Sequence, residues 1–105
     1  MTTVDQNTVW LGRAHCALTN SHNQYSAGYR GAFVVFACRA ENITLAVDQF
    51  CRELAEHNLI VIGFEYLENQ PYMERGPEGV EIALIEKLET YPVQFADVHI
   101  YKPDG

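Results

Sequence analysis

The sequence predicts one α+β domain, an open sheet with two helices packed on one of its faces. Short runs rich in β-branched and aromatic residues alternate with two stretches of helical periodicity, at 43–56 and 77–91. The 105 residues show no composition shift or linker-like tract that would separate two domains. Hydrophobic residues make up 48% of the chain, enough for a core without metal or crosslinks. We therefore expect a single domain over residues 1–105.

The chain is expected to begin with a strand and a loop. Residues 8–18 (TVWLGRAHCAL) combine β-branched, aromatic and small apolar residues, which favours an N-terminal strand. Residues 19–28 are rich in Asn, Ser and Gly, a composition typical of a loop.

The next part, up to Leu67, is predicted to form a strand, a helix and a second strand. The run 33–38 (FVVFAC) is apolar throughout, which indicates a central strand buried on both sides. Asn42 is a good helix cap, and apolar residues then recur at helical spacing. Residues 59–67 (LIVIGFEYL) read as a strand parallel to the first. The apolar helix positions are Ile43, Val47, Phe50 and Leu54.

The remaining segment is predicted to add a short strand, a helix and a last strand. After a turn at 68–71, residues 72–75 form a short antiparallel edge strand. Gly76-Pro77 opens the second helix, Pro92 stops it, and 93–101 is the final strand. This order is the ferredoxin-like βαββαβ sandwich, over residues 29–102, with an extra N-terminal strand. If 72–75 is not a strand, the N-terminal strand becomes the fourth member of another open α/β sheet with two helices on one face.

Charge and leader pattern restrict the class of partner and the location. Fourteen acidic residues against seven basic ones give a net charge of −7, which disfavours binding to nucleic acid and suits a basic protein partner or a small molecule. Neither a signal-like start nor a membrane-length apolar run is present, so we expect a cytoplasmic protein with reduced cysteines that does not enter a membrane. We expect no cofactor and no metal, because the sequence has no glycine-rich phosphate cradle and no spacing with three convergent ligands.

The last predicted strand supplies the first candidate site. Strict alternation places Asp97 and His99 on the outward side, with side-chain bases roughly 6–7 Å apart. Such a carboxylate can orient an imidazole, which predicts an acid/base pair. Tyr66 or Tyr101 could then donate a hydrogen bond to a developing oxyanion. The residues expected to face outward are Phe95, Asp97, His99 and Tyr101, while Ala96, Val98 and Ile100 meet the helices.

The same outward face also suits binding to a partner. Tyr66, Phe95 and Tyr101 would form a self-complementary aromatic surface for a twofold homodimer. Ile82 and Ile85 fall outside the apolar stripe of the second helix and need cover, which supports a homo-oligomer. Arg39 lies in the turn before the first helix, a place where small ligands bind.

These observations lead to a leading function and two alternatives. The leading hypothesis is a non-enzymatic, dimeric binding or interaction protein that holds a protein or small ligand at an uncovered sheet face. An immunity or antitoxin-like protein is one form of it, suggested by small size and acidity. The alternatives are a small dimeric ferredoxin-like enzyme using His99 and Asp97, and a regulatory domain that senses a metabolite near Arg39.

Overall fold

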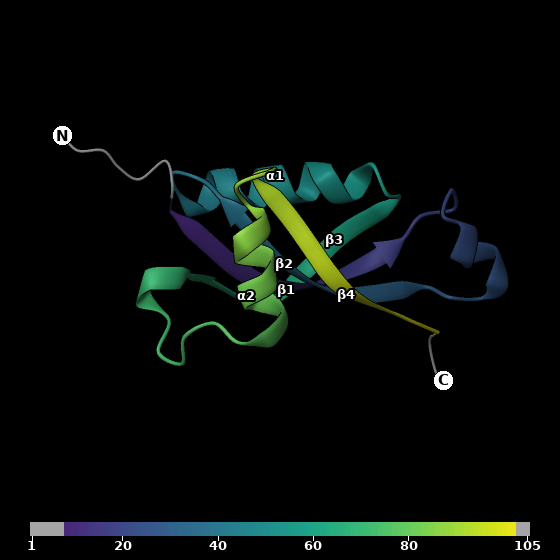
Figure 1. Cartoon of the computed structure of the whole chain (residues 1–105). Helices are drawn as coiled ribbons and strands as arrows, with labels where there is room; N and C mark the ends of the chain where they lie inside the picture. Colours follow the sequence, from purple (N-terminus) through teal and green to yellow (C-terminus); the bar gives the residue numbers. More distant parts are fainter. Residues whose placement is uncertain (1–7, 103–105) are drawn as a thin grey trace.

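The computed structural model describes residues 8–102, which form a four-stranded sheet with two helices (Figure 1). Every pairing in the sheet is antiparallel, and the strand order is β3-β1-β2-β4. β1 and β2 are therefore the central strands, and β3 and β4 are the edges. The strands are β1 (Val9–Leu18), β2 (Gly31–Arg39), β3 (Leu59–Asn69) and β4 (Val93–Tyr101).

A long β-hairpin opens the described chain. β1 occupies the stretch expected to be the N-terminal strand, and it pairs with β2 along most of its length, beginning with Val9 opposite Arg39. The connecting loop contains a 3₁₀ turn, η1 (Asn23–Ala27). Gly28 ends this turn at a φ of 96°, a conformation that glycine adopts at little steric cost.

The first helix, α1 (Ile43–Ala55), lies where the sequence predicts it. The Asn42 side chain caps the first turn, as expected, by accepting a hydrogen bond from a backbone N–H. Ala46, Phe50 and Leu54 recur at helical spacing and are fully buried against the sheet. The amphipathic pattern therefore located the helix and, through Phe50 and Leu54, part of its buried face, whereas Ile43, also expected on that face, is 46% exposed.

An aromatic stack joins α1 to the sheet. The rings of Phe50 and Phe36 are stacked with centroids 3.7 Å apart, and both side chains are fully buried. Phe36 lies across from Gly12 on β1. A Cβ at Gly12 would lie 2.7 Å from the Phe36 ring, so glycine makes room for this stack.

The connection from β3 to α2 differs from the predicted one. Residues 72–75 do not form an edge strand. Instead, β3 continues to Asn69 and is followed by a single 3₁₀ turn (Gln70–Tyr72), after which the chain leaves the sheet as a loop. Pro71 lies within this turn and has no N–H to donate to a neighbouring strand. The helix α2 (Gly79–Lys87) is also shorter than the expected helix at 77–91.

The ferredoxin-like strand order is therefore not observed. β2 and β3 run parallel to each other around α1, but they are not neighbours, because β1 lies between them. In the ferredoxin-like order the third strand of the unit lies between those two strands, a place that residues 72–75, predicted as an edge strand, would have had to occupy. Here β1 occupies that position, so the order along the chain is ββαβαβ. This matches the alternative in which the N-terminal strand is the fourth member of an open sheet.

The two helices pack on opposite faces of the sheet, whereas the sequence analysis placed both on one face. In Figure 1, α1 lies along the top of the sheet and α2 crosses in front of it. Alternate residues of β2 divide between the helices, which explains why this strand is apolar throughout. On the α1 side lie Val34, Phe36, Cys38, Phe50 and Leu54; on the α2 side lie Val35, Ala37, Leu84 and Leu88.

Three register shifts change which side chains share a face. β3 has one extra residue at Ile62 and another at Glu65 relative to β1. In β4, residues 97–98 lie opposite the single residue Val34 of β2. Each extra residue reverses the alternation beyond it, so positions that should share a face under strict alternation can point in opposite directions.

Candidate functional site

The α2 helix covers only half of its sheet face. It packs over the half that contains Val35 and Ala37. On the other half, alternate residues of β1 and β2 are half-buried, whereas the residues between them are buried under α1. Within residues 8–102 no helix covers this second half. We call the three rings that gather there the aromatic patch: His15, Phe33 and Tyr101.

The aromatic patch is held together by its own contacts. His15 and Phe33 lie opposite each other on β1 and β2, and their rings are stacked with centroids 4.6 Å apart. His15 Nε2 and Tyr101 Oη are hydrogen-bonded at 2.5 Å. A Cβ at Gly31 would lie 2.7 Å from Tyr101 Cε2, so a larger residue at this position would displace the tyrosine ring. The three rings are therefore fixed in place without a ligand.

Charged and aliphatic residues surround the aromatic patch. The Arg13 guanidinium lies 4.9 Å from the centroid of the Phe33 ring, a cation–π distance. The same group forms an ion pair with Glu65, with Nη1 and Oε1 2.7 Å apart. Ile60 of the neighbouring edge strand lies opposite Ala17 of β1 and is 53% exposed. The surface therefore combines rings, one cation and an exposed aliphatic side chain.

A second polar cluster lies where β3 meets α2. Arg75 contacts both carboxylate oxygens of Glu81 at 2.9 Å, and Tyr66 Oη donates to Oε2 at 2.6 Å. The backbone N–H of Glu78 donates to Oε1, which closes the first turn of α2. Glu81 is only 4% exposed.

The charges in this cluster are stable near neutral pH. The Arg75 guanidinium lowers the pKa of Glu81 to about 2 although burial opposes this change, and Tyr66 contributes a further hydrogen bond. Burial and the bond to Glu81 raise the pKa of Tyr66 to about 12. The bond to Glu81 also raises the pKa of Arg75. No group here exchanges a proton near pH 7, so the cluster acts as an anchor for the loop and for α2.

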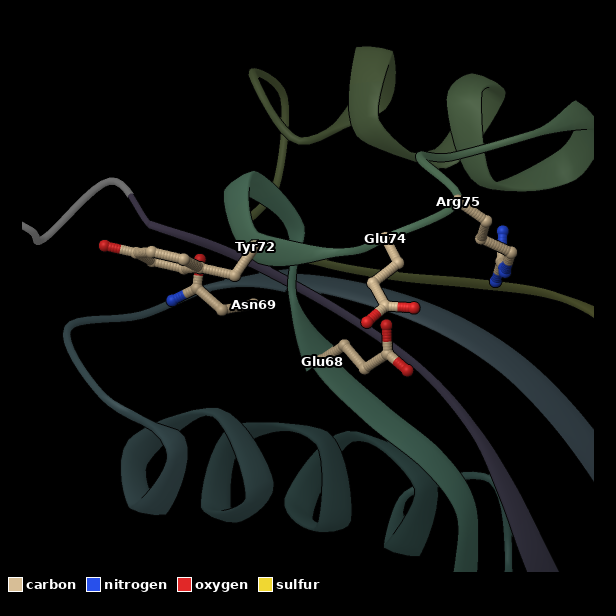
Figure 2. A pocket seen from close by; sticks show the side chains of 5 residues that line it. All are labelled: Glu68, Asn69, Tyr72, Glu74 and Arg75. Carbon is tan, nitrogen blue, oxygen red and sulfur yellow. The ribbon is translucent and has the colours of Figure 1, made fainter.

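An open cleft adjoins this cluster, with a volume of about 590 Å³ (Figure 2). The carboxylates of Glu68 and Glu74 face each other there, while Arg75 points away from them. Tyr72, at 84% exposed, stands at the other end of the cleft. Two facing carboxylates give the cleft a negative character, which suits a cationic group. Its lining consists of Glu68, Asn69, Tyr72, Glu74 and Arg75.

Thiol and metal chemistry find little support in the described part of the chain. Burial raises the pKa of Cys16 to about 11 and that of Cys38 to about 12, so neither thiol forms the reactive anion at neutral pH. Among residues 8–102, no group of three or more His, Cys, Asp or Glu side chains is placed to hold a metal ion.

The structure separates the residues that were expected to form one outward face. Tyr101 belongs to the aromatic patch, and Tyr66 belongs to the Glu81 cluster. Phe95 lies on the other face, under α1, where its ring meets the His57 ring edge-on at 5.2 Å. The predicted common surface of Tyr66, Phe95 and Tyr101 is therefore wrong, because the shift at 97–98 reverses the alternation between Phe95 and Tyr101.

The predicted acid/base pair is only partly described. His99 is exposed and stands opposite Phe33 of β2, on the patch side of the sheet. The side chain of Asp97 lies outside the described part of the structure, so their pairing stays a prediction. Three clefts in the structure have linings that do not include His99.

The other predicted binding residues are dispersed. Ile82 is 46% exposed on α2, as expected for a residue that needs cover. Ile85 instead packs against the core under α2. Arg39 ends β2, and its carbonyl accepts a hydrogen bond from Gln49 at 3.1 Å. Its Nε is buried without a hydrogen-bond partner in the described structure.

Sequence reasoning missed His15, Phe33 and Arg13 as members of a common site. Alternation along β1 places Arg13 and His15 on one side, so this signal was available. Phe33 could not be assigned to a face, because residues 33–38 are apolar at every position. Pairing of β1 with β2 was the missing information.

Comparisons of the chain with protein-family models, with curated proteins and with solved structures find no match. Neither α1 nor α2 is long and apolar enough to cross a membrane, and the same holds for every helix within residues 8–102.

Proposed function

We propose that this chain is a non-enzymatic protein-binding domain whose binding surface is the aromatic patch with Arg13 at its rim. One observation carries the proposal: α2 leaves half of its sheet face uncovered, and this half bears stacked rings. The solvated face of an antiparallel sheet ordinarily bears polar side chains. Aromatic residues and arginine are enriched at the centres of protein interfaces.

The contacts within the patch favour binding of a partner at low entropic cost. Phe33 is held between His15 and Arg13, and Tyr101 is hydrogen-bonded to His15. Side chains that are already ordered lose little rotamer freedom when a partner covers them. The patch is therefore preorganised as a docking surface.

The charge of the chain supports a basic partner. The net charge is −7, and the facing carboxylates of Glu68 and Glu74 add a local negative site. Complementary charge raises the association rate and weakens binding as salt increases. We therefore expect the partner to carry Lys or Arg around an apolar centre, and its affinity to fall between low and moderate salt.

The experiment begins with capture of the partner from the source cells. A photo-cross-linking amino acid replaces the exposed Ile60, which lies beside the patch. The same substitution at the exposed Ile82 on α2 serves as the matched control. We expect an adduct from position 60 that position 82 does not give. The recovered protein is then titrated against the purified chain by calorimetry.

The titration decides whether the patch binds the recovered partner. We expect Phe33→Ala and Arg13→Ala each to raise Kd about tenfold, as truncation of a central interface residue does. Tyr91→Ala is the control, because Tyr91 is an exposed aromatic residue in the connection between α2 and β4. This substitution should leave Kd unchanged. A partner that binds the folded Phe33→Ala and Arg13→Ala variants as tightly as the original chain contradicts the proposal.

A further inference from the structure

The acidic residues of this chain are unevenly distributed. The sequence has 14 Asp and Glu residues, yet residues 8–40, which form β1, β2 and the loop between them, contain none. The same stretch includes Arg13, Arg30 and Arg39, three of the seven basic residues. The β1–β2 hairpin is therefore positively charged within a chain whose net charge is −7.

Two cations come together at the end of the sheet where this hairpin turns. The backbone N–H of Arg30 donates to the carbonyl of Tyr101, so Lys102 leaves β4 beside the loop. A Cβ at Gly28 would lie 3.9 Å from Lys102 Cε, which shows that the lysine side chain reaches back across the loop. The loop and the end of β4 lie at the same end of the molecule (Figure 1). Arg30 and Lys102 are both exposed, and within residues 8–102 neither forms an ion pair.

Two tyrosine rings hold these cations in place. Arg30 Cζ lies 4.4 Å from the centroid of the Tyr25 ring, and Lys102 Nζ lies 5.0 Å from that of Tyr29. Nη1 of Arg30 also donates to the carbonyl oxygens of Tyr25 and Tyr29, at 3.1 and 3.0 Å. Its Nε and Nη2 groups form no hydrogen bond in the described part of the chain, so these donors remain for a ligand. Both rings pack against the core on the α1 side, which fixes the positions of the two cations.

We propose that Arg30 and Lys102 bind a short acidic segment of a partner protein, with two neighbouring carboxylates. A guanidinium with free N–H groups binds one carboxylate by directed hydrogen bonds, and the ammonium attracts the second as a point charge. Cations that already lie against rings lose little rotamer freedom when the segment binds. The site does not depend on the proposed function, because Tyr25 and Tyr29 pack on the α1 side and the aromatic patch lies on the α2 side.

The same contacts favour an acidic peptide over a nucleic acid. Nucleic-acid single strands bind by stacking their bases on exposed aromatic rings. Tyr25 and Tyr29 each pack against the core and have a cation over the ring, which leaves little ring surface for a base. A long polyanion would also meet the acidic remainder of the chain, whereas a short segment contacts only the hairpin end.

Fluorescence anisotropy with a labelled hexaglutamate peptide tests the site. We expect saturable binding at low salt that weakens when salt is raised, because exposed charges are screened. A hexaglutamine peptide of the same length should not bind. A thymidine hexanucleotide is the second probe, and we expect it to bind more weakly than hexaglutamate.

Single substitutions locate the binding. Lys102→Gln and Arg30→Gln should each raise the Kd for hexaglutamate about fivefold, as loss of one exposed ion pair does. Lys102→Gln leaves the hydrogen bonds of Arg30 to the loop intact, so it keeps the test valid if Arg30→Gln disorders the loop. Lys87→Gln removes an exposed cation from α2 and is the matched control, with an unchanged Kd.

Four results would overturn the inference. They are absence of hexaglutamate binding at low salt, an equal loss with Lys87→Gln, tighter binding of the hexanucleotide, and loss of binding with Phe33→Ala. The last result would place the peptide at the aromatic patch. Failure of the patch to bind a partner would contradict the proposed function and leave hexaglutamate binding unchanged.

Discussion

Tyr66 of β3 donates a hydrogen bond of 2.6 Å to Glu81 of α2, and this bond closes residues 70–78 against the sheet. Arg75, within that segment, forms two further bonds to the same carboxylate. One buried side chain thus joins a strand, a loop and the first turn of a helix. This explains why residues 72–75 follow the path to α2 and do not pair with the sheet.

The carboxylate of Glu81 should make the stability of the protein depend on acid pH. Its pKa is about 2 in the folded chain and near 4.5 when unperturbed. A lowered pKa stabilises the fold above the unperturbed value, and this contribution is lost as pH falls from about 4.5 toward 2. We expect Glu81→Gln to lower the unfolding free energy by on the order of 2–3 kcal/mol at pH 7. Urea denaturation at several pH values measures this.

The exposed Glu86 provides the matched control for that substitution. Glu86→Gln should change the unfolding free energy by less than about 0.5 kcal/mol at any pH. The gap between the original chain and Glu81→Gln should narrow at pH 3. A gap that stays constant down to pH 2 would show that the carboxylate does not carry the charge assigned to it.

The hydroxyl of Tyr66 should make the stability of the protein depend on pH in the alkaline range. Burial and the neighbouring carboxylate raise its pKa from 10 to about 12. A raised pKa contributes stability that is complete below pH 10 and is lost as pH rises toward 12. Tyr66→Phe should cost about 1 kcal/mol at pH 7 and remove this alkaline loss. Denaturation at pH 7 and pH 11 compares the two chains, and an equal loss in both would contradict the assignment.

The cysteines should differ in their reactivity toward a thiol-modifying reagent. Cys16 and Cys38 are buried with raised pKa values, and Cys51 is only partly buried. In the folded protein we expect one thiol to react first and two to react only as fast as the chain opens. Cys51→Ser should abolish the fast reaction. If the fast reaction survives, one of the two buried cysteines is accessible and the packing described for the α1 face is incorrect.

The sequence was sufficient to predict the four strands and the two helices, although not the path of residues 72–75. Asn42 with the spacing of Phe50 and Leu54 located α1 and part of its buried face, because a helix is determined by near neighbours. The apolar run 33–38 likewise indicated a strand buried on both sides. That interpretation already implied cover on both faces of the sheet. The expectation that both helices lie on one face conflicted with this interpretation of residues 33–38. In the structure, the two helices cover opposite faces of the strand.

The candidate site was harder to predict, because it depends on pairing between distant strands. Phe33 and His15 meet only because β1 and β2 pair in one register. Tyr101 joins them because the extra residue at 97–98 turns it to the same face. A bulge of this kind leaves no periodic signal in the sequence of its own strand. Strict alternation therefore placed Phe95 beside Tyr101, although they lie on opposite faces.

The geometry of the aromatic patch can be tested through Gly31, which leaves space for the Tyr101 ring. Gly31→Ala would place a Cβ 2.7 Å from Tyr101 Cε2, so the ring has to move away from His15. We expect a loss of about 1–3 kcal/mol in stability, as for overpacking of a buried site, together with shifted NMR signals of the His15 ring. Gly63→Ala is the matched control, because a Cβ there meets nothing within 4 Å. If both variants leave the His15 signals unchanged, Tyr101 does not pack over Gly31, and the patch lacks the order on which its proposed role in binding depends.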